Sequence, residues 1–134
     1  MFLNQLSDEN KKLFLSLETI LTHVDGDFSI SEQRLISNHC AEMGIEPIEF
    51  NEKLHLEDLA VNINNSMSVR DKKIIFIELI AVALVDGEYH ENEKKFIDSL
   101  RSFLGIPQEV SEQAIELIQK LLAVSNEVEN FVEW

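Results

Sequence analysis

A short phrase that occurs twice, at an offset of sixty-one residues, constrains the fold of this chain more than any other feature. The first copy is Val-Asp-Gly-Asp-Phe at residues 24–28, followed by Glu32; the second is Val-Asp-Gly-Glu-Tyr at residues 85–89, followed by Glu93. Other pairs share the offset, namely Ser7 with Ser68, Lys11 with Lys72, Ile36 with Ile97, and Gly44 with Gly105. Repetition at a fixed period is typical of a duplicated structural unit.

The repeat predicts the domain organisation. We expect a single domain over residues 1–134, with repeat units at roughly 7–65 and 68–124 and a C-terminal tail at 125–134. A compact chain of this length buries about two thirds of the surface that it exposes when unfolded, so it can form a substantial core. Residues 62–66, Asn-Ile-Asn-Asn-Ser, are the expected connector between the units, and they are too few for a flexible linker between independent domains.

The hydrophobic pattern predicts an all-α fold, a single-domain helical bundle of about seven helices formed by internal duplication of a three-helix unit. Apolar residues recur at helical spacing, and no segment alternates as a half-buried strand does. Ser29 and Glu32 have the spacing of a capping box, and Pro47 is expected near the start of the third helix. The segment Ile74–Val85 is apolar on nearly all sides, which predicts a central helix.

The end of the chain carries a second apolar pattern. Five residues of the last long helix are expected on one inward face: Val110, Ala114, Leu117, Ile118 and Leu121. In the tail, Val128, Phe131, Val132 and Trp134 have the spacing of a short helix. We expect this helix to dock on the body of the protein, and the alternative is that it docks on a partner.

Charge limits the partners of this chain. It has 25 acidic and 11 basic residues and a formal charge of −14, which repels phosphate backbones and anionic lipid surfaces. We therefore expect no nucleic-acid partner, and cations or basic protein surfaces are better candidates. The stretch Ile74–Val85 is too short to span a bilayer, Cys40 is the single cysteine, and no secretory signal is recognisable, so we expect a cytoplasmic protein without membrane insertion.

The two copies of the phrase form acidic corners between helices, and these are the candidate site. Asp25 and Glu32 converge on the first corner, as Asp86 and Glu93 do on the second. Carboxylate oxygens suit a divalent cation such as calcium or magnesium, although neither corner has the first ligands of an EF-hand loop. The alternative is structural: the carboxylates cap backbone N–H groups and hold a tight corner without any metal.

Glu78 is a possible accessory acid because it lies inside an otherwise apolar helix. A buried, unpaired carboxylate is costly, so we expect an ion pair with Lys11 or Lys12, or exposure at a rim, and alternatively a place in the acidic site. The four histidines have no zinc-ligand spacing, and the chain has no nucleophile elbow, phosphate loop or dinucleotide fingerprint. These observations predict a protein that is not an enzyme.

The order of these motifs resembles the tellurite-resistance TerB family. An apolar helix ends in Asp-Gly, five variable residues follow, a glutamate opens the next helix, and Leu-Gly-Ile closes it at residues 104–106. The resemblance extends roughly from Leu13 to Leu122. It implies a small helical bundle with an acidic face, a role in bacterial stress and tellurite resistance, and binding of metal ions or partner proteins. The carried-over acidic positions are Asp25, Glu32, Asp86 and Glu93.

Two functions follow from the sequence. The first is a non-enzymatic TerB-like domain whose acidic corners bind a divalent cation, a partner protein or both in a stress response. The second is an adaptor module without metal, in which the corners are purely structural and the tail around Phe131 and Trp134 engages a partner. Neither function determines the oligomeric state.

Overall fold

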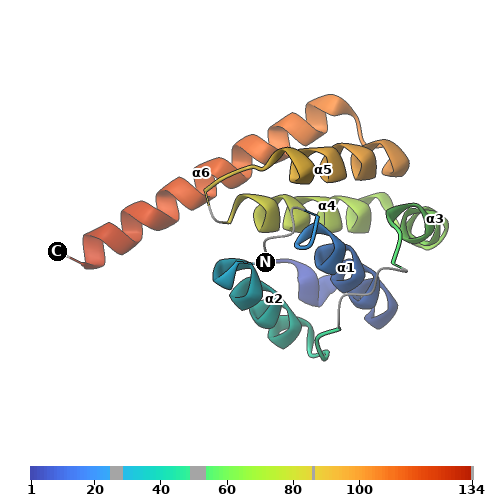
Figure 1. The fold of residues 1–134 in the computed structure, drawn as a ribbon, viewed down its shortest axis with the longest axis horizontal. Helices are drawn as coiled ribbons and strands as arrows, with labels where there is room; N and C mark the ends of the chain where they lie inside the picture. The colour runs from blue at the N-terminus through green and yellow to red at the C-terminus, as the bar shows by residue number, and fades with distance from the viewer. Residues whose placement is uncertain (25–28, 49–53, 86, 134) are drawn as a thin grey trace.

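A computed structural model describes residues 1–24, 29–48, 54–85 and 87–133. These ranges contain six α-helices, one 3-10 helix and no strand, which confirms the all-α helical bundle (Figure 1). The elements are η1 (Leu3–Gln5), α1 (Asp8–Leu21), α2 (Ile30–Met43), α3 (Leu56–Ser66), α4 (Val69–Leu84), α5 (Glu91–Leu104) and α6 (Gln108–Val132). The expected seventh helix is not confirmed, because α6 continues without interruption through most of the tail.

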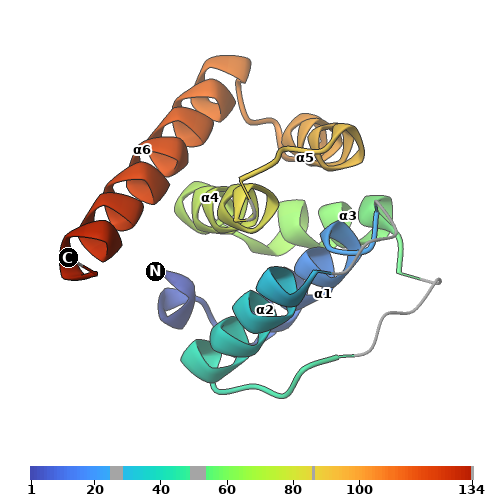
Figure 2. The ribbon, with the colours of Figure 1, turned by 60° about the vertical axis from the view of Figure 1, so that its left-hand side comes forward.

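Helix α4 lies at the centre of the bundle, as its apolar sequence predicts. Figure 2 shows α4 between α1, α5 and α6, and these three helices all pack against it. Its fully buried side chains include Ile75, Leu79 and Ile80. A helix that is apolar on all sides avoids water only when neighbours cover every face, so the remaining helices are arranged around this one.

Local signals place the helix boundaries. The Ser7 and Ser29 hydroxyls accept hydrogen bonds from the backbone N–H groups of Asn10 and Glu32, as N-caps do. Gly44 ends α2 in the left-handed conformation, with φ of 70°, and Gly105 ends α5 with the same φ. Helices α2 and α5 begin sixty-one residues apart and end sixty-one residues apart. These boundaries match the sequence repeat, while the duplication itself stays a prediction.

Three expectations about the chain's segments are wrong. Residues 62–66 do not connect two units, because they form the second half of α3. Pro47 does not open the third helix, which begins at Leu56. In the tail, Val128 and Val132 are exposed rather than docked on the body, and Trp134 lies outside the described residues. No helix in the described ranges has both the length and the apolarity needed to cross a membrane.

Candidate functional site

The first acidic corner is described from Ser29 onward, and Asp25 lies outside the described residues. The predicted capping box is confirmed: the Ser29 backbone N–H donates to Glu32 Oε1 at 3.1 Å, and the Glu32 backbone N–H donates to Ser29 Oγ at 3.1 Å. The Glu32 side chain is buried. One oxygen of this carboxylate therefore stabilises the start of α2.

The second corner repeats this geometry, although Asp86 lies outside the described residues. Gly87 has a φ of 82°, a conformation that favours glycine, and the His90 backbone N–H donates to Glu93 Oε1 at 3.1 Å. Glu93 is buried at the start of α5. Burial, together with the nearby Glu93 and Asp98 carboxylates, raises the pKa of Tyr89 to about 12, so this phenol stays protonated at neutral pH.

The end of α1, directly before the first corner, contacts the start of α5 in the second corner. The side-chain amide of Asn92 donates to the backbone carbonyl of Val24 at 3.2 Å and joins the start of α5 to the end of α1. Val24 directly precedes Asp25, and Asn92 directly precedes Glu93. The end of α1 and the start of α5, which are far apart in the sequence, thus meet at one end of the bundle.

Within the described ranges, no three or more His, Cys, Asp or Glu side chains form a group that could hold a metal ion. Asp25 and Asp86 lie outside these ranges, and the four-carboxylate site stays a prediction. The described members of the predicted site, Glu32 and Glu93, occupy equivalent cap positions in α2 and α5.

Glu78 belongs to a different polar cluster, between α4, α2 and the N-terminal segment. Its side chain is 2% exposed, and Oε1 accepts a hydrogen bond from the backbone N–H of Phe2 at 2.9 Å. The Met1 ammonium lies 3.0 Å from the same oxygen and 3.2 Å from Glu42 Oε1. The expected ion pair with Lys11 or Lys12 and the expected exposure at a rim are therefore wrong.

The same cluster contains Glu18 and His39, which were not predicted from the sequence to belong to a site. His39 Nδ1 lies 2.5 Å from Glu18 Oε2, and His39 Nε2 lies 3.9 Å from Glu78 Oε2. All three side chains are buried, and Glu18 Oε1 has no hydrogen-bond partner among the described residues. A signal was present in the sequence, since Glu18 follows Phe14 by four positions and precedes Leu21 by three, on the apolar face of α1.

Burial raises the pKa of the Glu18 carboxyl above 4.5; the His39 contact lowers it, and the Glu78 charge raises it further. At a pH between the pKa of Glu18 in the unfolded chain and its higher pKa in the folded protein, the folded protein holds a proton that the unfolded chain releases. The stability that Glu18 contributes therefore decreases as pH rises through this range. We expect Glu18→Gln to gain stability relative to the wild type as pH increases from about 4.5 to 7.5. Urea unfolding of both proteins across this pH range measures the difference in stability.

The exposed Glu9→Gln variant in the same helix is the control, because it removes an equal charge without altering a buried group. Its stability difference from the wild type should stay nearly constant over the same pH range. Parallel pH profiles for Glu18→Gln and Glu9→Gln would contradict the assigned pKa direction.

Residues 51–116 match the family model of tellurite resistance protein TerB. This segment belongs to the TerB family. The TerB-like segment spans α3, α4, α5 and the start of α6 and includes the second corner, whereas Asp25 and Glu32 precede it. Neither a curated protein nor a solved structure matches this chain.

Proposed function

We propose that this TerB-like chain is a non-enzymatic binding protein of a bacterial stress response, of the tellurite-resistance type, and that its two acidic corners together bind a divalent cation. The proposed ligands are Asp25, Glu32, Asp86 and Glu93, and the proposed ion is calcium or magnesium. The observation that supports the proposal is the hydrogen bond between Asn92 and Val24, because it joins the residue directly before Asp25 to the residue directly before Glu93.

A single corner offers few ligands, whereas hard cations take six or more oxygen atoms, partly from water. Two adjacent corners double the number of carboxylates within reach of one ion. Glu88 and Glu91 are exposed beside the second corner and add negative charge to the same end of the bundle. Like charges at such a surface repel one another, and a bound cation relieves that repulsion. A basic partner protein would use the same charges.

A second function has its own supporting observation. Glu32 and Glu93 each accept a hydrogen bond from the backbone at the start of a helix. Capping alone explains why these residue types stand at these positions. In this alternative, the chain is a protein-interaction adaptor without metal, and the corners only shape the fold.

Isothermal titration with calcium, magnesium, manganese and zinc tests the metal proposal. We expect calcium or magnesium to release binding heat with the wild type and none with the double variant Asp25→Asn/Asp86→Asn. The matched control is Asp58→Asn/Glu112→Gln, which removes two exposed acids elsewhere and should bind as the wild type does. A bound cation at a concentration of 100 times its Kd should stabilise the fold by roughly 2.7 kcal/mol.

Melting without added cation separates the two functions. If the aspartates hold an ion, their replacement by asparagine should leave the melting temperature unchanged or raise it, because repulsion is relieved. A sharp fall would instead assign the aspartates to the structure of the corner. Absence of heat from all four cations at millimolar concentration would eliminate the metal site and leave the adaptor.

A further inference from the structure

Helix α6 carries an apolar stripe that the body of the protein covers at its start, where Ala114 is buried and Val110 half-buried, and leaves exposed from Leu117 onward. The stripe consists of Val110, Ala114, Leu117, Leu121, Val124, Val128 and Phe131. Successive members are alternately four and three residues apart, the spacing of a coiled-coil seam. Leu117, Leu121, Val124 and Val128 are 48%, 44%, 55% and 58% exposed. The face that α6 turns to the body adjoins this stripe, with Ser111, Ala114 and Ile118 buried.

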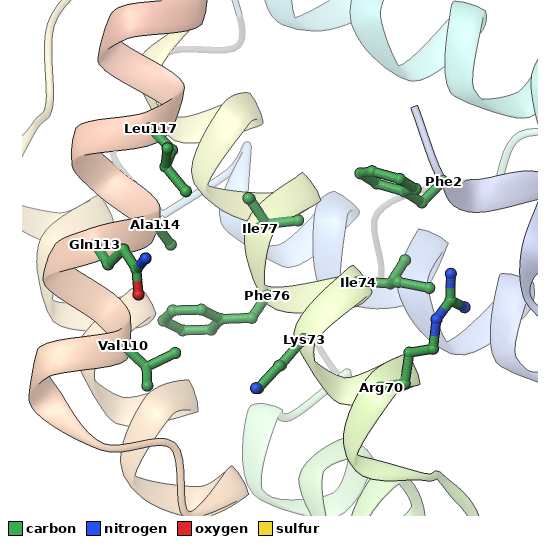
Figure 3. Close-up of a pocket in the computed structure, with 10 residues that line it drawn as sticks. All are labelled: Phe2, Arg70, Lys73, Ile74, Phe76, Ile77, Val110, Gln113, Ala114 and Leu117. Carbon is green, nitrogen blue, oxygen red and sulfur yellow. The ribbon is translucent and has the colours of Figure 1, made fainter.

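The first third of this stripe forms one wall of a groove of about 360 Å³ between α6 and α4 (Figure 3). From α6, Val110, Ala114 and Leu117 line it, and from α4, Phe76 and Ile77 are among its apolar residues. The rest of the stripe continues beyond the groove along the part of α6 that extends past the other helices (Figure 1). The helix therefore offers both a receiving groove and a projecting apolar segment.

The charges of these two parts are complementary. Two cations, Arg70 and Lys73, line the groove on its α4 side, and Figure 3 shows Lys73 at the same end of the groove as Val110. The projecting segment carries exposed carboxylates at Glu129 and Glu133. An apolar stripe flanked by acids thus fits an apolar groove flanked by bases, in a chain that is otherwise strongly acidic.

The projecting segment of α6 cannot occupy the groove between α6 and α4 of the same chain. Helix α6 is continuous, and at 1.5 Å per residue Phe131 lies about 25 Å along the axis from Ala114. The segment that fills the groove must therefore come from another chain. A second copy supplies it in both directions, because each copy carries both this groove and the projecting segment.

We propose that two copies of this chain associate through α6, in an antiparallel pair in which each copy's projecting segment occupies the other's groove. With Leu121 facing its own counterpart on the twofold axis, Val124 faces Leu117, Val128 faces Ala114, and Phe131 faces Val110. The larger valine meets the small alanine, and the acidic end of one helix reaches the basic end of the other copy's groove. The pairing is independent of the metal site at the acidic corners.

Sedimentation equilibrium of the full chain tests the association, with a dimer expected at twice the chain mass of 15.4 kDa. Leu121→Glu places a carboxylate from each copy on the twofold axis and should raise the dimer Kd about 100-fold or more, because a buried, unpaired charge is unfavourable. Val61→Glu, at an exposed apolar position on α3, is the control and should remain dimeric. Circular dichroism checks that both variants keep the helical content of the wild type.

The orientation is tested with spin labels on Asn130→Cys, since Cys40 is buried. The antiparallel pair places the two labels about 27 Å apart along the helix axis, whereas a parallel pair places them about 10 Å apart. Arg70→Glu/Lys73→Glu should weaken the dimer, and adding Glu129→Lys/Glu133→Lys in the same chain should restore it.

Three outcomes would overturn the proposal. The first is a wild type that stays monomeric up to millimolar concentration, which would leave a different protein as the partner of α6. The second is a dimer that Leu121→Glu does not dissociate, which would place the interface elsewhere. The third is a label separation near 10 Å, which would reject the antiparallel arrangement.

Discussion

Replacing His39 with alanine is expected to lower the free energy of unfolding by about 3–5 kcal/mol at pH 7.5. The imidazole is the hydrogen-bond partner of the Glu18 carboxylate and lies beside Glu78. Its removal leaves Glu18 buried without a partner and also creates a cavity next to Phe14, whose ring packs edge-on against the imidazole. Urea unfolding, followed by circular dichroism, measures the loss.

The control for this prediction is His55→Ala, because His55 is exposed before α3 and makes no side-chain capping bond. It should change stability by less than about 0.5 kcal/mol. The double variant Glu18→Leu/His39→Leu removes the acid and its partner together and should recover most of the loss. A loss below 1 kcal/mol for His39→Ala would mean that Glu18 reaches another partner or water.

The sequence predicted the helix ends better than the contacts between helices, and the reason is the range of the interactions. A cap joins groups within a few residues, so Ser7, Ser29 and Gly44 could be assigned from their immediate neighbours. The Glu18–His39 pair joins residues twenty-one positions apart on different helices. Nothing local to either residue indicates the other, so only the packed fold reveals the pair.

For Glu78, the sequence correctly predicted that the carboxylate needs a partner, but the predicted partner was wrong. An acid in an apolar helix requires a partner, and the predicted partner was Lys11 or Lys12. The structure instead supplies the Met1 ammonium and the backbone N–H of Phe2, and no residue-type pattern reveals either group. The sequence therefore predicted that Glu78 needs a partner, but not that the N-terminal segment provides it.

Two helix boundaries were misjudged because tertiary contacts and length outweighed local composition. The asparagines of residues 62–66 suggested a connector, yet the Asn64 side chain donates to the Phe103 carbonyl and holds α3 against α5. Residues 125–134 were separated as a tail, although α6 has no proline or glycine to stop it before Val132. For the acidic corners, the sequence predicted both capping glutamates, while the contact between Val24 and Asn92 needed the structure.

The second large effect is expected at the centre of the bundle, where Ile80→Ala should lower the free energy of unfolding by about 2–5 kcal/mol. Ile80 on α4 is fully buried at 0% exposure, and α1, α5 and α6 all pack on this helix. A cavity there cannot close without moving several helices, so little of the lost packing is recovered.

Ile30→Ala is the matched control, since Ile30 is 67% exposed at the start of α2 and the chemical change is identical. Its effect should stay within about 0.5 kcal/mol, because little apolar surface leaves a packed environment and alanine favours the helix. Urea unfolding of both variants, with the same dependence of free energy on urea, isolates the packing contribution. Equal effects at the two positions would contradict a central α4, and with it the arrangement that brings the ends of α1 and α5 together.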